Sequence, residues 1–148
     1  MADAPAGEPL LIRAARPEDT GLLLELFGER PAAQALIAEL GAQPVGYALF
    51  FGTFSSFLAS EGVWLEDLFV RPDHRGAGVG RALLSAVAAH VCEHGGKRLE
   101  WAALDWNELA LGFYRSLGAR TMGEWITHRL HGDALRSLAR ESADRPAL

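Results

Sequence analysis

Two adjacent carboxylates stand inside an otherwise apolar stretch of this sequence. Glu66 and Asp67 interrupt the run from Val63 to Val70, where charged side chains are costly unless they line a cleft or find partners. The pair could serve as a base and an ammonium anchor, because an alkylamine with a pKa of about 10 must lose a proton before it attacks. An edge strand with one acid in solvent and the other bonded to backbone is the structural alternative. Strand alternation would send the two side chains to opposite faces unless a bulge intervenes.

A glycine-rich turn follows this run, with the sequence Arg75-Gly76-Ala77-Gly78-Val79-Gly80-Arg81. Such a turn gathers unpaired backbone N–H groups at the start of a helix, and the two arginines add positive charge. The dinucleotide pattern G-x-G-x-x-G fails because Arg81 occupies its third glycine position, and no P-loop lysine follows. The turn predicts a ligand that carries a pyrophosphate, although a merely tight turn would also explain the glycines.

The remaining reactive side chains give weaker signals. His90 and His94 frame a formal zinc-peptidase pattern, His90-x-x-Glu93-His94, without a third ligand in view. Gly95-Gly96 ends that segment at once, so we expect no metal. Cys92 is expected on the buried face of the helix, as inert packing.

Hydrophobic periodicity predicts the elements that must position these residues. Strands are expected at 10–13, 45–51, 63–70, 99–104 and, as one long strand or two short ones, 121–130. The segment 32–40 is ambiguous between helix and strand, and 35–40 could form a hairpin with 45–51 through the turn at 41–44. Helices are expected at 22–27, 80–94, 108–117 and 132–140, and a polar and aromatic loop at 54–61.

Length, composition and net charge limit the classes of protein to which this sequence could belong. The chain has 148 residues, 49% of them hydrophobic, which suits one folded domain over 10–140 between flexible tails at 1–9 and 141–148. A net charge of −5 argues against nucleic acid as a partner. One cysteine excludes an internal disulfide framework and suits the cytoplasm, and neither a signal peptide nor a membrane-spanning run is visible.

Three blocks of sequence, in this order, resemble the diamine (spermidine/spermine) acetyltransferase branch of the GNAT superfamily. They are Trp64-Leu65-Glu66-Asp67-Leu68-Phe69-Val70, then Arg75-x-x-Gly78-x-Gly80, then Asp105-Trp106-Asn107-Glu108 leading to Phe113-Tyr114 and Gly118-Ala119. The resemblance covers about residues 44–140. It implies a single α/β (α+β) GNAT domain, a mixed and mostly antiparallel sheet flanked by helices, with central strands splayed around acetyl-CoA.

The resemblance also implies roles for individual residues. Glu66 would help to deprotonate a primary amine, Asp67 would hold the amine's charge, and Tyr114 would protonate the departing thiolate as general acid. Glu124 would add negative charge near the acceptor. From the residues alone, Tyr114 could simply pack, Asn107 could be only a helix cap, and Glu124 could equally be a solvent-facing strand acid. The residues expected to bind acetyl-CoA are Leu68, Val70, Arg75, Gly76, Gly78, Gly80, Arg81, Asn107 and Tyr114.

The expected reaction is direct transfer in a ternary complex, since no nucleophilic Ser or Cys lies beside a base. The expected acceptor is a small diamine or polyamine, and the expected assembly is a homodimer. A lysine-like amino acid, a protein amine, and a non-catalytic acyl-CoA-binding module stay open as alternatives. They stay open because the segment from Arg13 to Pro31 is shorter than in the family and lacks its aromatic-acidic pair.

Overall fold

The computed structural model describes residues 9–16, 19 and 31–143. The contacts divide the chain into two compact units, residues 1–102 and 103–148, and each is described by itself. The helix predicted at 22–27 and most of the two predicted tails lie outside the described residues. The division into one domain with flexible tails therefore stays a prediction.

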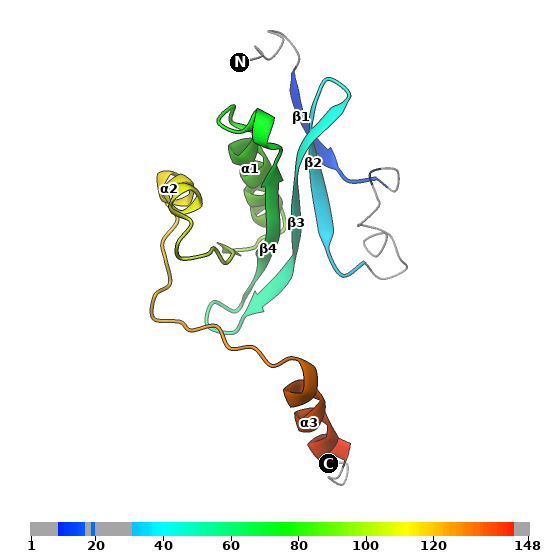
Figure 1. Cartoon of the computed structure of the whole chain (residues 1–148), viewed down its shortest axis with the longest axis vertical. Coiled ribbons are helices and arrows are strands. Elements are labelled where there is room, and N and C mark those ends of the chain that lie inside the picture. The colour runs from blue at the N-terminus through cyan, green and yellow to red at the C-terminus, as the bar shows by residue number, and fades with distance from the viewer. Residues whose placement is uncertain (1–8, 17–18, 20–30, 144–148) are drawn as a thin grey trace. The chain divides into compact units, whose positions relative to one another are not determined.

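A five-stranded sheet forms the body of the first unit (Figure 1). Its strands follow one another in chain order, and every neighbouring pair is antiparallel except the last, which is parallel. They are β1 (Leu10–Ala14), β2 (Gln34–Leu40), β3 (Gln43–Ser55), β4 (Ser60–Val70) and β5 (Leu99–Glu100). The predicted mixed, mostly antiparallel sheet is confirmed.

The ambiguous segment before Gly41 is a strand. β2 pairs with β1 on one side and with β3 on the other, and its residues Ala35, Ile37 and Ala38 are buried. The loop is shorter than the predicted 54–61, because β3 and β4 extend into both of its ends as a long hairpin. The turn is confined to residues 56–59, where the Ser55 hydroxyl oxygen accepts a hydrogen bond of 3.2 Å from the backbone N–H of Leu58.

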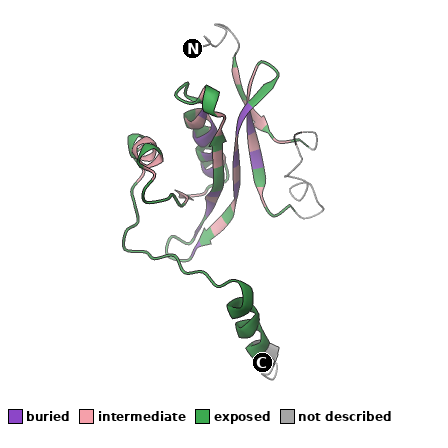
Figure 2. Ribbon diagram, in the orientation of Figure 1, coloured by how far each residue is buried: buried purple, intermediate pink, exposed green. Residues whose placement is uncertain are grey.

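Helix α1 (Val79–Glu93) packs on one face of this sheet and closes the core (Figure 2). Its buried side chains are Val79, Leu83, Leu84, Val87 and Val91. The approach is close, since a Cβ at Gly46 of β3 would lie 3.3 Å from Cδ1 of Leu83 on α1. The prediction that Cys92 is buried is wrong: Cys92 lies outside the apolar stripe and is exposed.

Two predicted strands are corrected by the structure. β5 ends at Glu100 rather than Leu104, and its pairing with β4 ends at the pair Trp64–Glu100. The segment 121–130 forms no strand: the backbone N–H of Trp125 donates to the oxygen of Met122 at 3.1 Å, which makes a turn around Gly123. That turn interrupts the extended backbone that a strand requires.

The described part of the second unit contains two helices, α2 (Glu108–Ser116) and α3 (Gly132–Ala143), close to their predicted bounds. Across the described part of the chain, no helix has the length and apolar character needed to cross a membrane.

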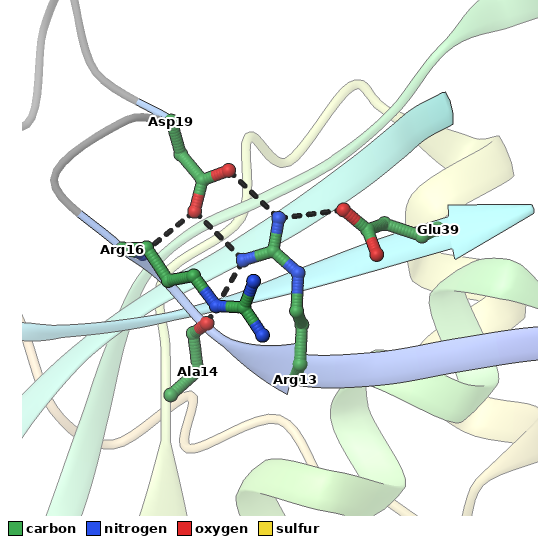
Figure 3. A network of polar contacts seen from close by, with 5 residues as sticks. All are labelled: Arg13, Ala14, Arg16, Asp19 and Glu39. Carbon is green, nitrogen blue, oxygen red and sulfur yellow. Dashed lines mark hydrogen bonds and ion pairs between the residues drawn. The ribbon is translucent and has the colours of Figure 1, made fainter. Parts of the chain in front are cut away.

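An ion network joins β1, β2 and the start of the segment that follows β1 (Figure 3). The guanidinium of Arg13 donates to both carboxylate oxygens of Asp19, at 2.8 and 2.7 Å, and to Glu39. Asp19 also accepts the backbone N–H of Arg16 at 2.6 Å. The Arg13 guanidinium holds the pKa of Asp19 down to about 2 and lowers that of Glu39.

Candidate active site

Strand β4 carries a β-bulge at the two carboxylates. Asp67 pairs with Leu49, but the next residue of β3, Phe50, pairs with Leu65, so Glu66 is an extra residue. Both carboxylates are exposed, although they are adjacent. A bulge removes the alternation that would separate them, and it places both side chains on the sheet face opposite α1.

The bulge also reverses which residues of β4 face α1. Before it, Val63 and Leu65 are buried, while after it Leu68 and Val70 are the more buried residues and Phe69 is exposed. The backbone of β4 is thereby bent where the strand stops pairing with β5.

Trp64 holds the carboxylate of Glu66. Its indole Nε1–H donates to Glu66 Oε2 at 2.9 Å. Sequence reasoning missed this contact, although the spacing i, i+2 on a strand places two side chains on one face and was the available signal.

Tyr47 of β3 lies close to the other carboxylate. Burial raises the pKa of Tyr47, and the negative charge of Asp67 adds to the increase. The ring of Tyr47 lies 5.6 Å from that of Phe69, centroid to centroid. A short sequence pattern cannot predict that Tyr47 and Asp67 are neighbours, because the register of the β3–β4 hairpin brings them together.

The far edge of β4 is open beyond Trp64, since β5 pairs in the described structure only with Val63 and Trp64. The backbone N–H of Arg71 donates to the oxygen of Val45 on β3 at 2.9 Å. Because antiparallel pairs alternate between bonded and non-bonded positions, the peptide groups of Val70 and Leu68 point toward the open edge. The backbone N–H and C=O groups of these two residues thus face the side on which an extended ligand could lie.

The Arg75 side chain already uses one of these groups. Its Nε–H donates to the backbone oxygen of Val70 at 2.9 Å. The predicted contact of this arginine with a phosphate stays a prediction, and in this structure its side chain covers a strand acceptor.

The glycine-rich turn lies between a short 3-10 helix (Pro72–His74) and α1. Gly76 and Gly78 have φ of 78° and 85°, the left-handed region that favours glycine. Gly78 is the N-cap of α1 and supplies no side-chain cap, so the helix's first N–H groups are not covered by that residue. Gly80 lies in the first turn of α1, next to the exposed Arg81.

Three predicted site residues fall in the second unit. Asn107 is the N-cap of α2, where its side-chain oxygen accepts from the N–H of Ala110 at 3.2 Å. Tyr114 lies in α2 and is half-buried, and this burial raises the pKa of its phenol. Glu124 is exposed in the turn after α2. The structure gathers the other predicted residues along β4 and the turn that follows it, all in the first unit.

Metal ligands do not gather in the described ranges: no group of three or more His, Cys, Asp or Glu side chains could hold an ion. The ring of His90 stacks on that of His94, with centroids 4.2 Å apart, and lies against Phe50. His90 thus packs at the interface between helix and sheet, whereas His94 is exposed.

Residues 7–119 match the acetyltransferase (GNAT) family. The chain belongs to this family. The predicted class of enzyme, an acetyl-CoA-dependent N-acetyltransferase, is confirmed at the level of the family.

Named relatives point the same way. The chain is 36% identical over 124 residues to the thialysine N-epsilon-acetyltransferase of Bos taurus, an alignment that covers 76% of this chain and 72% of the relative. It is 44% identical over 93 residues to the L-ornithine N5-acetyltransferase of Arabidopsis thaliana, which covers 63% of this chain. That alignment spans 41% of the length of the plant enzyme.

Solved structures share the fold. An integron cassette protein from V. cholerae superposes with a TM-score of 0.72 at 30% identity, over 78% of this chain and 72% of the other. A ribosomal-protein-alanine N-acetyltransferase from Brucella melitensis gives a TM-score of 0.70 at 21% identity. The superposition covers 84% of this chain and the whole of the Brucella chain. The predicted GNAT fold is confirmed.

Proposed function

We propose that this protein transfers the acetyl group of acetyl-CoA to the primary amine of a small aliphatic molecule. The observation that carries the proposal is the bulge in β4, which presents Glu66 and Asp67 on one face beside an unpaired strand edge. The edge suits the amide groups of a pantetheine arm, and the glycine turn that follows suits its pyrophosphate. One extended ligand would therefore run along β4 and end at α1.

The two carboxylates divide the work on the amine. The substrate arrives as an ammonium ion, which Asp67 holds by charge while Glu66 takes a proton, directly or through water. The neutral nitrogen then attacks the thioester carbonyl, the C–S bond breaks, and the nitrogen gives its second proton to water. Tyr114 gives its phenol proton to the leaving thiolate, and its raised pKa keeps that proton in place at neutral pH.

The acceptor we propose carries its amine at the end of a short aliphatic chain. Relatives named for thialysine and ornithine support an amino acid of that shape as much as a diamine or polyamine. The acidic face around the bulge suits the cationic end that these compounds share.

The test is acetyl-CoA-dependent thiol release by the purified chain, with diamines, polyamines, ornithine, lysine analogues and short peptides offered in parallel. We expect selective release with one class of small amines and none with peptides. Acetyl-CoA binding without release on any of these amines would contradict the proposal and favour a binding module.

A Glu66→Gln variant serves as the matched control, because it keeps the size of the side chain and removes the base. We expect it to bind acetyl-CoA normally and to lose turnover by about a hundredfold or more.

A further inference from the structure

We propose that Trp64 is a positioning residue that fixes the carboxylate of Glu66 for proton transfer. The proposal rests on the proposed function, because it takes Glu66 as the proton acceptor. Its starting point is the hydrogen bond of 2.9 Å from the indole Nε1 to Glu66 Oε2. The described part of the chain gives the Glu66 side chain no other hydrogen bond or ion pair.

Trp64 lies two residues before Glu66, at a position where β4 is paired on both sides. It pairs with Phe51 of β3 on one side and with Glu100 of β5 on the other, and it is the last residue of β4 paired with both strands. The indole is partly buried, whereas Glu66 is exposed two residues further on. A donor anchored in the closed part of the sheet thus reaches an acceptor at the beginning of the open part.

Glu66 is exposed at the bulge, which explains why its carboxylate needs a hydrogen-bond donor to hold it. An exposed glutamate has several rotamers, and a carboxylate that samples them all spends little time in one productive position. The indole bonds one oxygen, Oε2, and leaves Oε1 available to the amine or to a bridging water.

Indole suits this task chemically. It donates a hydrogen bond but cannot accept one, so it does not compete with Glu66 for the proton. It is also neutral, so it does not repel an approaching ammonium as lysine or arginine would at this position.

The experiment is a double-mutant cycle with Trp64→Phe, Glu66→Gln and the two combined. Phenylalanine keeps an aromatic ring on the sheet and removes the N–H donor. We expect Trp64→Phe to lower kcat about tenfold while the KM for acetyl-CoA and the Kd for coenzyme A stay unchanged. In the Glu66→Gln background the same change should have no further effect.

Phe51→Leu is the matched control, since it removes aromatic area beside Trp64 without touching the N–H. We expect it to lower the unfolding temperature and to leave kcat unchanged. An equal loss of kcat in this variant would show that packing, rather than the hydrogen bond, is responsible and would overturn the proposal.

Two further outcomes separate the proposal from the function on which it rests. A Trp64→Phe variant with wild-type kcat, beside an inactive Glu66→Gln variant, overturns the role of Trp64 alone. A fully active Glu66→Gln variant overturns the role of Glu66 as base, and the role of Trp64 with it.

Discussion

At the scale of single residues, Tyr114 is the side chain whose chemistry can be tested most directly. Tyr114→Phe removes the phenol proton and keeps the ring, so we expect kcat to fall about a hundredfold while the Kd for coenzyme A stays nearly the same. Because burial raises the pKa of this phenol, wild-type activity should not decline at alkaline pH until above about pH 10. Steady-state rates across pH measure both effects. Unchanged kcat in the variant would exclude Tyr114 as the general acid.

The contact between Arg75 and Val70 predicts two opposite responses to a single substitution. Arg75→Ala removes charge from the pyrophosphate site but also frees the backbone oxygen of Val70. We expect the variant to bind acetyl-CoA about tenfold more weakly and to bind acetyl-pantetheine, which lacks the pyrophosphate, as well as or better than the wild type. Calorimetric titration measures both affinities.

Arg81→Ala is the control for that experiment, because no hydrogen bond from Arg81 to Val70 is present in the described structure. It should weaken only acetyl-CoA. Equal weakening of both ligands by Arg75→Ala would show that Arg75 stabilises the turn instead of covering the strand edge.

At the scale of elements, the turn before α1 depends on a left-handed residue. Gly78→Ala meets no neighbouring atom, but it places a side chain at φ of 85°. We expect a loss of about 1–2 kcal/mol in unfolding free energy and weaker coenzyme A binding, measured by denaturant unfolding and calorimetry. Gly52→Ala is the matched control, because that glycine of β3 also has free space and has no positive φ. An equal loss in both variants would contradict the conformational explanation.

The elements that were predicted correctly are those whose own residues carry the signal. The apolar stripe of α1 and the Asn107 cap of α2 are local patterns, and the sequence blocks that resemble the family extend through both helices. The bulge at Glu66 depends on the register between β3 and β4, which cannot be predicted from a local pattern. Strand alternation alone does not determine whether a bulge is present. The strand predicted at 121–130 failed because a strand requires a partner, and the turn at Gly123 competes with extended backbone.

For the candidate site, the sequence alone indicated the carboxylates and the glycine turn, because both are contiguous in the chain. It missed Trp64 and Tyr47, whose contacts exist only after the strands pair or their side chains adopt particular rotamers. The assigned roles of Glu66, Asp67 and Tyr114 stay predictions, as do the cytoplasmic location and the homodimer.

At the scale of the whole molecule, the Arg13 network makes stability depend on pH. Asp19 and Glu39 have pKa values below their ordinary ones in the folded chain, so folding is favoured when both are charged. This stability is fully present above the unfolded values of about 4 and is lost as pH falls toward 2. We expect Arg13→Met to lower the unfolding temperature at pH 7, and the difference from wild type to shrink as pH falls.

Thermal unfolding at a series of pH values from 7 to 2 measures this effect. Arg136→Met is the control, because its pair with Asp133 lies exposed on α3 and contributes little. A difference between Arg13→Met and wild type that stays constant down to pH 2 would contradict a charge-based role for the network.

The open edge of β4 also has a consequence for how copies of this protein behave in concentrated solution. The peptide groups of Leu68 and Val70 at this edge, apart from the Val70 oxygen that Arg75 bonds, are a template on which any extended chain can add a strand, including a strand from a second copy in the wrong register. Phe69 lies between these two residues in the chain, and its exposed side chain adds apolar surface. A bound pantetheine arm would occupy the same donors and acceptors. The co-substrate would therefore protect the protein against aggregation, so that purification and storage are best done with coenzyme A present.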